Sequence, residues 1–335
     1  MADLKSWNPW HGCRKYSEGC AHCYMYALDR IREVPERSAQ IARTQAMLKP
    51  LARDRRGNFR IPSGYCLRVN MTSDTFLEEA DGWRGEMWDV IRRRPDVRFY
   101  ILTKRVPRIA ECLPPDWGDG WENVELNFSC ENQRAFDERW PVFRDVPAKH
   151  KGMNLAPLIG EIDISPALAS GQIECVCCGG ESFGGERPCR YEWVKRISDD
   201  CWRHRVNFAF NSTGTRFEKD GRIYRMEMKN IHAEQAFKSR LSCFFGEPEY
   251  KLFDPFDGHR LAKWELMERR YHADKCPGCT MMELCIGCVD CGSCKNVRLV
   301  GFDEAARLRN ESLSSINHPF RKFSVSSPRE YGNMV

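Results

Sequence analysis

Two apolar runs decide the fold: VRFYILT at residues 97–103 and VELNFS at residues 124–129. Each run has the length and composition of a buried strand. Comparable runs are YCLRVN (65–70), GMNLAPLI (152–159), IECVC (173–177) and VNFAFNS (206–212). Six such runs, separated by longer polar segments, predict a sheet with intervening helices.

The segments between the runs carry helical patterns. Residues 84–94 and 191–203 both repeat apolar side chains at helical spacing. Alternation of strand and helix implies a parallel sheet. With a further strand near residues 4–10 and helices across 24–53, the chain has six or seven βα units, which predicts an α/β fold with a partial or complete (βα) barrel. An open doubly wound sheet is the alternative.

Polar residues gather where four of these strands end. They are Asn70 to Asp74, Thr103 to Arg105, Ser129 to Asn132, and Gly179 to Ser182. The chemistry of a barrel lies at the carboxyl ends of its strands. Each segment could instead be a helix cap or a turn. Recurrence at the same end of several strands favours a site.

The βα rhythm stops after about residue 215, which predicts a core at 1–215 and an appended module at 216–335. The chain has 335 residues, 42% of them hydrophobic, enough to bury a large core. A net charge of +5 permits an anionic partner without requiring one. No apolar run has the length of a signal peptide or a membrane span, so we expect a cytoplasmic protein with no membrane contact.

The 18 cysteines need an explanation, because a cytoplasmic chain of this length does not depend on disulfides. Cys13, Cys20 and Cys23 lie within GCRKYSEGCAHCYM. Three thiolates are one fewer than a closed zinc or electron-transfer site uses, which leaves a coordination position for a substrate. The alternative is a zinc knuckle in which two of these cysteines are joined by His11 or His22.

Two further groups of cysteines follow. Six lie in CPGCTMMELCIGCVDCGSC at 276–294: Cys276, Cys279, Cys285, Cys288, Cys291 and Cys294. This spacing fits an auxiliary iron–sulfur cluster or a zinc ribbon. Four others surround a glycine-rich stretch: Cys175, Cys177, Cys178 and Cys189. They could complete a second accessory cluster or be buried strand cysteines; in a strand, Cys177 and Cys178 would point to opposite faces.

Six ordered motifs resemble one family: WNPWHGC with two further cysteines, NMTSDTF, LTKR, FSCENQ, NLAPLIGEIDI and GGESFGGERP. This is an uncharacterised family of radical S-adenosylmethionine proteins, often found in phage genomes and named for phage gene products. Over about residues 6–214 the chain is similar to it, including six residues between the first two cysteines and two between the last two. Phage origin would place the protein in the host cytoplasm.

The resemblance implies a four-iron, four-sulfur cluster on Cys13, Cys20 and Cys23, whose fourth iron binds S-adenosylmethionine. It also implies one or two auxiliary iron–sulfur clusters and a reductant such as flavodoxin or ferredoxin. The expected cofactor-binding residues are Gly179, Gly180, Glu181, Ser129, Glu131 and Asn132, and the expected substrate-binding residues are Lys104 and Arg105. Both cations could equally be solvated.

The chain departs from the family pattern at two places near the expected mouth of the barrel. Ala156 stands where a glutamate is usual, and Asn211 to Gly214 replace Lys-Gln-Trp-Gly. The contacts to substrate are therefore expected to differ from those of typical members.

The predicted function is a radical enzyme that modifies or isomerises a nucleobase in DNA or RNA, such as a phage base bearing an amino-acid substituent. The support is modest: ten tryptophans that could stack bases, and basic stretches at Arg53, Arg55, Arg56, Arg60 and Arg92 to Arg94. Core tryptophans and solvated helix faces explain these residues equally well. One rival is a radical enzyme acting on a peptide or free amino acid; another is a non-catalytic zinc-ribbon protein that binds nucleic acid.

Overall fold

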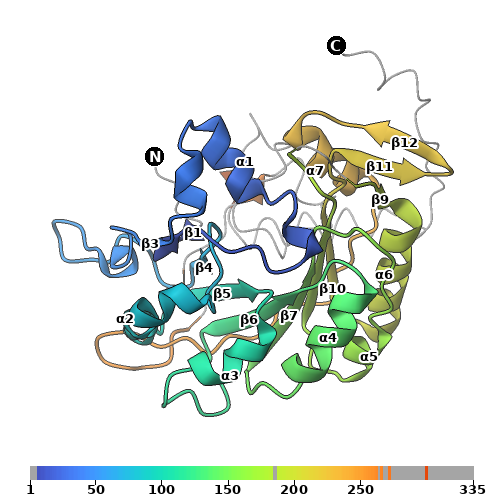
Figure 1. The fold of residues 1–335 in the computed structure, drawn as a ribbon. Coiled ribbons are helices and arrows are strands. Elements are labelled where there is room, and N and C mark those ends of the chain that lie inside the picture. The colour runs from blue at the N-terminus through green and yellow to red at the C-terminus, as the bar shows by residue number, and fades with distance from the viewer. Residues whose placement is uncertain (1–5, 184–186, 263–264, 267–270, 273–298, 301–335) are drawn as a thin grey trace.

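The computed structural model describes residues 6–183, 187–262, 265–266, 271–272 and 299–300. A seven-stranded parallel sheet forms its centre, and its strands follow one another in chain order (Figure 1). They are β1 (Ser6–Trp7), β4 (Cys66–Val69), β5 (Arg98–Thr103), β6 (Val124–Ser129), β7 (His150–Leu155), β8 (Cys175–Gly179) and β10 (Asn207–Ser212). The six predicted strands and the strand expected near residues 4–10 are confirmed.

The sheet curls into a half-barrel. Tyr100 on β5 lies within electrostatic reach of Cys177 on β8, although β6 and β7 separate their strands. In a flat sheet these strands would be about 14 Å apart, because neighbouring strands are about 4.8 Å apart. The two side chains therefore share the concave face. Strand order without a reversal excludes the doubly wound alternative and is compatible with a partial (βα) barrel.

The convex face of the sheet packs against helices. Along β5, Phe99 and Ile101 are fully buried, whereas the alternate side chains are only partly buried. Phe128 of β6 contacts the aromatic side chains of the helix that follows. The α-helices between β4 and β10 are α2 (Asp81–Arg92), α3 (Ile109–Cys112), α4 (Gln133–Phe143), α5 (Ser165–Ala169) and α6 (Tyr191–His204). The helices predicted at 84–94 and 191–203 correspond to α2 and α6.

The chain between β1 and β4 is mostly irregular. It contains β2 (Trp10–His11), α1 (Tyr24–Ile31) and β3 (Ala42–Arg43), and β2 and β3 pair antiparallel. Of the helices expected across 24–53, only α1 is an α-helix. Two short 3-10 helices follow: η2 (Pro35–Ser38) begins at Pro35, and η3 (Lys49–Leu51) has Pro50 in its first turn. Proline is tolerated in the first turn of a helix but not in its interior, so these segments do not extend into longer helices. Three further 3-10 helices are η1 (Glu18–Cys20), η4 (Glu78–Ala80) and η5 (Val106–Arg108).

The chain after β10 continues to pack on the sheet. β11 (Arg216–Lys219) pairs with β12 (Arg222–Arg225) and also with β9 (Cys189–Arg190), while α7 (Lys229–Lys238) packs against β10. A small antiparallel pair joins β13 (Tyr271–His272) to β14 (Leu299–Val300). The boundary near residue 215 stays a prediction. The cysteine-rich run at 276–294, with Cys276, Cys279, Cys285, Cys288, Cys291 and Cys294, lies outside the described residues. None of the helices in the described part of the chain has the length and apolar character needed to cross a membrane.

Candidate functional site

The cysteine loop, residues 12–23, lies over the carboxyl edge of the sheet. It is attached just beyond β4, where the Gly12 amide donates to the Thr72 carbonyl at 3.2 Å and the Ser73 hydroxyl donates to the Gly12 carbonyl at 2.5 Å. Gly12 has φ +89°, a conformation that favours glycine. Within the loop, the three free thiols of Cys13, Cys20 and Cys23 are partly exposed.

Gly19 holds the loop against a residue that follows the central strand of the sheet, β6. Its amide donates to Glu131 Oε1 at 3.4 Å, and Glu131 follows β6. A Cβ atom at position 19 would lie 2.8 Å from Glu131 Cδ, closer than real Cβ contacts allow. The absence of a side chain at Gly19 therefore lets the loop rest directly on the Glu131 carboxylate.

Glu131 is a fully buried anion held by two cations. Lys104 Nζ lies 3.2 Å from Glu131 Oε2, and Arg139 Nη1 lies 3.0 Å from the same atom. Burial alone would raise the pKa of Glu131, but Lys104 and Arg139 outweigh it and lower that pKa to about 2. The carboxylate is therefore ionised at neutral pH.

Lys104 and Arg105 are engaged with protein groups. Lys104 Nζ donates to Ser129 Oγ at 2.7 Å in addition to pairing with Glu131. Arg105 is only 4% exposed. Its Nη1 atom lies 3.5 Å from Asp74 Oδ2, and its Nη2 atom donates to the Arg14 carbonyl at 3.0 Å. Arg105 is therefore not a solvated cation. The substrate-binding role of both residues stays a prediction.

Asp74 and Arg139 are two central residues that the sequence did not single out by role. Asp74 accepts from Thr103 Oγ1 at 2.7 Å and from the Lys104 amide at 3.1 Å, which ties the end of β4 to the end of β5. Arg139 lies on the apolar face of α4, between Phe136 and Phe143. An arginine on the apolar face of a helix needs a buried partner, so the position of Arg139 among apolar residues is the sequence signal that could have identified it.

The three thiols of the loop influence one another. Burial, the Asp74 carboxylate and the other two thiols raise the pKa of Cys13 to about 12. Burial and the neighbouring Cys20 sulfur also raise the pKa of Cys23. The thiols are close, and without a metal Cys13 holds its proton at neutral pH.

The spacing of these thiols is not that of a single-ion site. In the described residues, only Asp254, Asp257 and His259 bring three ligand atoms within 4.8 Å of one another. A tetrahedral zinc ion holds its thiolates about 3.8 Å apart, since each Zn–S bond is about 2.3 Å. In addition, His11 Nε2 is 2.7 Å from Asp29, which also accepts from Ser38 at 2.7 Å. Metal-binding histidines commonly have such a carboxylate partner on the other ring nitrogen, so the Asp29 contact does not exclude His11 as a ligand of a zinc knuckle.

The Gly179–Gly180–Glu181 segment packs tightly against the end of β10. A Cβ atom at Gly180 would lie 2.2 Å from the Thr213 carbonyl oxygen, whereas one at Gly179 would meet only ordinary contacts at 3.7 Å. The Gly180 amide donates to the Ser212 carbonyl at 2.9 Å. Backbone packing by itself therefore accounts for glycine at position 180, and cofactor binding by the segment stays a prediction.

Arg187 connects Glu181 to the cysteine loop. Its Nη2 atom donates to Glu181 Oε1 at 2.6 Å and to the Glu18 carbonyl at 3.0 Å, and its Nε atom donates to Glu181 Oε2 at 3.1 Å. Glu181 is 3% exposed. A ligand ammonium group that binds Glu181 would therefore have to share this carboxylate with Arg187.

Ser129 and Asn132 complete the set of predicted cofactor residues. Ser129 Oγ donates to the Ala156 carbonyl at 3.3 Å. Asn132 Oδ1 accepts from the Ala135 amide at 3.0 Å, so this residue is the N-cap of α4. The side-chain nitrogen of Asn132, Nδ2, donates to the Glu18 carboxylate. Side chains that follow β5, β6 and β8 thus all reach residues 14–19, and the predicted strand ends converge on the cysteine loop.

The third cysteine group divides between the two faces of the sheet. Cys178 and Cys189 are fully buried near Cys201, on the helix-covered side. Cys175 and Cys177 are partly exposed on the concave face. The expectation that Cys177 and Cys178 point to opposite faces of a strand is confirmed, so these two adjacent thiols do not meet at one site.

Some of the arginines and tryptophans named as nucleic-acid contacts are engaged within the protein. Arg94 has no exposed surface and pairs with Asp96 at 2.8 Å, and Arg92 pairs with Asp116 at 2.7 Å. The guanidinium carbon of Arg53 lies 4.6 Å from the centroid of the Phe59 ring. Five of the tryptophans are buried in the core: Trp7, Trp10, Trp88, Trp117 and Trp140. Arg55, Arg56, Arg60 and Arg93 are exposed, and the nucleic-acid substrate stays a prediction.

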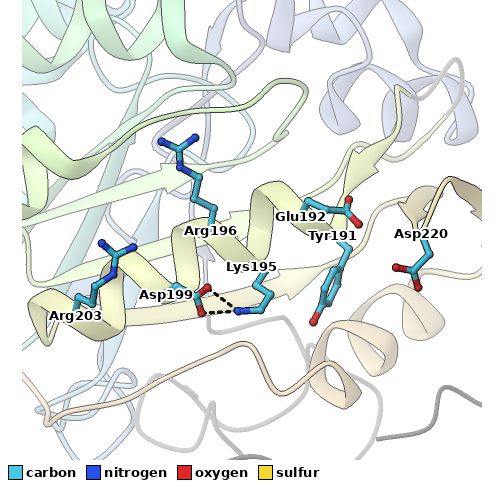
Figure 2. A pocket seen from close by; sticks show the side chains of 7 residues that line it. All are labelled: Tyr191, Glu192, Lys195, Arg196, Asp199, Arg203 and Asp220. Carbon is cyan, nitrogen blue, oxygen red and sulfur yellow. Dashed lines mark hydrogen bonds and ion pairs between the residues drawn. The ribbon is translucent and has the colours of Figure 1, made fainter. Parts of the chain in front are cut away.

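A groove lies along α6 and the β11–β12 turn (Figure 2). Several of its charged side chains pair within the protein: Lys195 with Asp199 at 2.6 Å, and Arg196 with Glu161 at 2.6 Å. None of the residues that line it belongs to the predicted site. It is a charged helix face of an ordinary kind.

Comparisons with known proteins give one positive result. Neither the curated proteins nor the solved structures contained a match. Residues 3–267 match a family described as "Protein of unknown function (DUF5131)", a span that includes the cysteine loop, the whole parallel sheet and α7. The chain therefore belongs to the DUF5131 family of proteins of unknown function.

Proposed function

We propose that this protein is a radical S-adenosylmethionine enzyme that modifies or isomerises its substrate by hydrogen abstraction. The observation that carries the proposal is the cysteine loop: three free, partly exposed thiols, placed at the carboxyl edge of a half-barrel sheet. This edge is where barrel enzymes assemble their chemistry. The motifs that resemble the radical family lie in the same segments.

The donor set fits an iron–sulfur cluster better than a single zinc ion. The thiols are near enough to shift one another's pKa, yet they are not gathered as one tetrahedral ion requires. A four-iron cluster takes each thiolate on a different iron, so its ligands stand farther apart. Cys13, Cys20 and Cys23 would hold such a cluster, and its fourth iron would remain for S-adenosylmethionine.

When bound, the cluster and S-adenosylmethionine supply a 5′-deoxyadenosyl radical, which removes a hydrogen atom from an unactivated carbon. The chain's own residues position the loop: Gly19 rests on Glu131, and Arg187 links Glu181 to the Glu18 carbonyl. The guanidinium carbons of Arg105 and Arg139 lie 5.1 and 5.6 Å from the centroid of the Tyr16 ring, so this ring partly shields both cations from water.

The substrate we favour remains a nucleobase in DNA or RNA, with a peptide or free amino acid as the rival. The polar concave face offers hydrogen-bonding side chains to either class. Auxiliary clusters on the cysteines at 276–294, and a flavodoxin or ferredoxin as reductant, belong to the same proposal. Binding of DNA or RNA that weakens steeply with salt would favour the nucleobase.

The test is metal and cofactor chemistry on anaerobically purified full-length protein. We expect iron and sulfide, an electron paramagnetic resonance signal that changes on adding S-adenosylmethionine, and 5′-deoxyadenosine after reduction with dithionite. Cys13→Ala, Cys20→Ala and Cys23→Ala should each abolish 5′-deoxyadenosine, whereas Cys112→Ala, away from the loop, should not. A colourless protein that contains zinc without iron would refute the proposal and favour the zinc-ribbon rival.

A further inference from the structure

Two cysteines of β8 share the concave face of the half-barrel. Cys175 and Cys177 are two residues apart in the strand, so their side chains point the same way. Both are partly exposed, whereas Val176 and Cys178, which face the helices, are fully buried. The two thiols are hydrogen-bonded to each other. They form an accessible dithiol inside the barrel.

The dithiol lies close to the proposed site. Cys177 is two residues before Gly179, which corresponds to about 6.6 Å along a strand. It pairs in register with Asn154 of β7, and the Asn211 side chain is hydrogen-bonded to its sulfur. Tyr100 reaches the same space from β5. The other charged groups that face the pair are Glu125 and Arg68.

The two sulfurs differ in position. Cys177 lies nearer the carboxyl edge of the sheet, where the proposed site is, and Cys175 begins β8 at the opposite edge. Cys177 is therefore the thiol nearer the substrate, and Cys175 is its partner. A sulfur–hydrogen bond is weaker than most carbon–hydrogen bonds, so such a pair gives hydrogen atoms readily to carbon radicals.

We propose that the Cys175–Cys177 pair returns a hydrogen atom to the carbon radical formed on the substrate above the concave face. This inference rests on the proposed function and names a further catalytic pair for it. Two observations assign this role to Cys175 and Cys177 among the thiols of the described residues: their side chains interact with each other, and both face the inside of the half-barrel.

The carbon radical takes the hydrogen atom of the Cys177 thiol, and the resulting sulfur radical forms a three-electron bond with the Cys175 sulfur as the Cys175 thiol releases its proton to water. This radical anion passes one electron to an oxidised one-electron carrier protein, which leaves a disulfide. An external dithiol then supplies two electrons and two protons, restores both thiols, and becomes a disulfide itself.

The geometry allows this disulfide but does not favour it. Residues two apart in a strand have Cα atoms about 6.4–6.8 Å apart, at the upper limit for a disulfide. A bond at that limit is easily reduced, as a cycling site requires.

The first experiment needs neither cofactor nor substrate. Full-length protein is treated anaerobically with diamide, free thiols are blocked, and fragments containing residues 175–189 are sequenced by mass spectrometry. We expect a Cys175–Cys177 disulfide that thioredoxin reduces. Cys178→Ala should retain it, while Cys175→Ser, checked for folding by circular dichroism, should lose it. If Cys175 and Cys177 stay reduced, or either pairs only with another cysteine, the proposal is overturned.

The second experiment follows the hydrogen atom in D₂O. Protein with S-adenosylmethionine and dithionite, without added substrate, should place deuterium from the dithiol into 5′-deoxyadenosine. Cys177→Ser should lower the deuterated fraction to background, and Cys178→Ala should not. If 5′-deoxyadenosine forms with the same deuterium content in all three proteins, the dithiol proposal fails. If the wild type forms no 5′-deoxyadenosine at all, the proposed function itself fails, whatever the disulfide result.

Discussion

Gly19 and Glu131 are 112 residues apart in the chain, and the Gly19 amide donates to the buried Glu131 carboxylate at 3.4 Å. The contact joins the loop that carries the three cysteines to the end of β6. It depends on the missing side chain at Gly19, since a Cβ atom would lie 2.8 Å from Glu131 Cδ. The position of the cysteines thus depends on a charge network at the ends of the central strands, built from Glu131, Lys104 and Arg139.

Gly19→Ala should displace the cysteine loop. We expect cofactor cleavage to fall at least about tenfold, because small misplacements of reacting groups are costly. Iron content per chain and 5′-deoxyadenosine formation are the measurements. Gly82→Ala is the matched control: Gly82 lies in α2 with open space around its Cβ position, so alanine should leave activity unchanged. Equal activity of both variants and wild type would show that the contact at Gly19 does not position the cysteine loop.

Glu131→Gln should destabilise the fold by about 3 kcal/mol, because it leaves Lys104 and Arg139 without their buried anion. Denaturant unfolding at pH 7 measures the loss. Since the pKa of Glu131 is lowered from 4.5 to about 2, its stabilisation is fully present above about pH 5 and is lost as the pH falls toward 2. The stability difference between wild type and variant should shrink over that interval. A difference independent of pH would contradict the assignment.

Cys13 should react slowly with iodoacetamide in the metal-free protein. With its pKa near 12, only about one molecule in ten thousand carries the thiolate at pH 8. The reaction rate should still be rising above pH 10, where a small thiol such as glutathione has levelled off. Mass spectrometry of the peptide that contains Cys13 gives the rate. Because metal binding must displace this proton, uptake of iron should also increase with pH.

Gly180→Ala and Gly179→Ala should differ sharply. A Cβ atom at 180 meets the Thr213 carbonyl oxygen at 2.2 Å, whereas one at 179 has ordinary contacts. We expect a loss of more than about 2 kcal/mol of stability for the first and less than about 1 for the second. Thermal unfolding without S-adenosylmethionine measures both. If Gly180→Ala is stable yet fails to bind S-adenosylmethionine, the glycine serves the cofactor and not the packing.

Arg187→Ala and Glu181→Gln should be strongly coupled in a double-mutant cycle. Arg187 holds the Glu181 carboxylate through both of its oxygens, and Glu181 is nearly fully buried. We expect a coupling of about 1–3 kcal/mol in unfolding free energy. The Lys195–Asp199 pair on the exposed face of α6 is the control and should couple by less than about 0.5 kcal/mol. Independent effects of Arg187 and Glu181 would show that the contact contributes little.

Several features could be read from local patterns. The strands were predictable because a buried parallel strand needs an unbroken apolar run, as in VRFYILT and VELNFS. The opposite orientation of Cys177 and Cys178 followed from strand geometry alone. Charge in the sequence does not reveal burial: in the basic stretch at Arg92 to Arg94, Arg94 is fully buried against Asp96, whereas Arg92 and Arg93 are exposed.

The amino-acid sequence by itself determined the succession of strands and helices, the three closely spaced thiols and the polar strand ends, because each depends on residues near one another in the chain. Only the tertiary structure decided the partners. The curl of the sheet brings Tyr100 toward Cys177, Gly19 onto Glu131, and Arg187 between Glu181 and the cysteine loop. Contacts between residues so far apart in the chain depend on how the whole sheet twists and packs, and no local pattern encodes them.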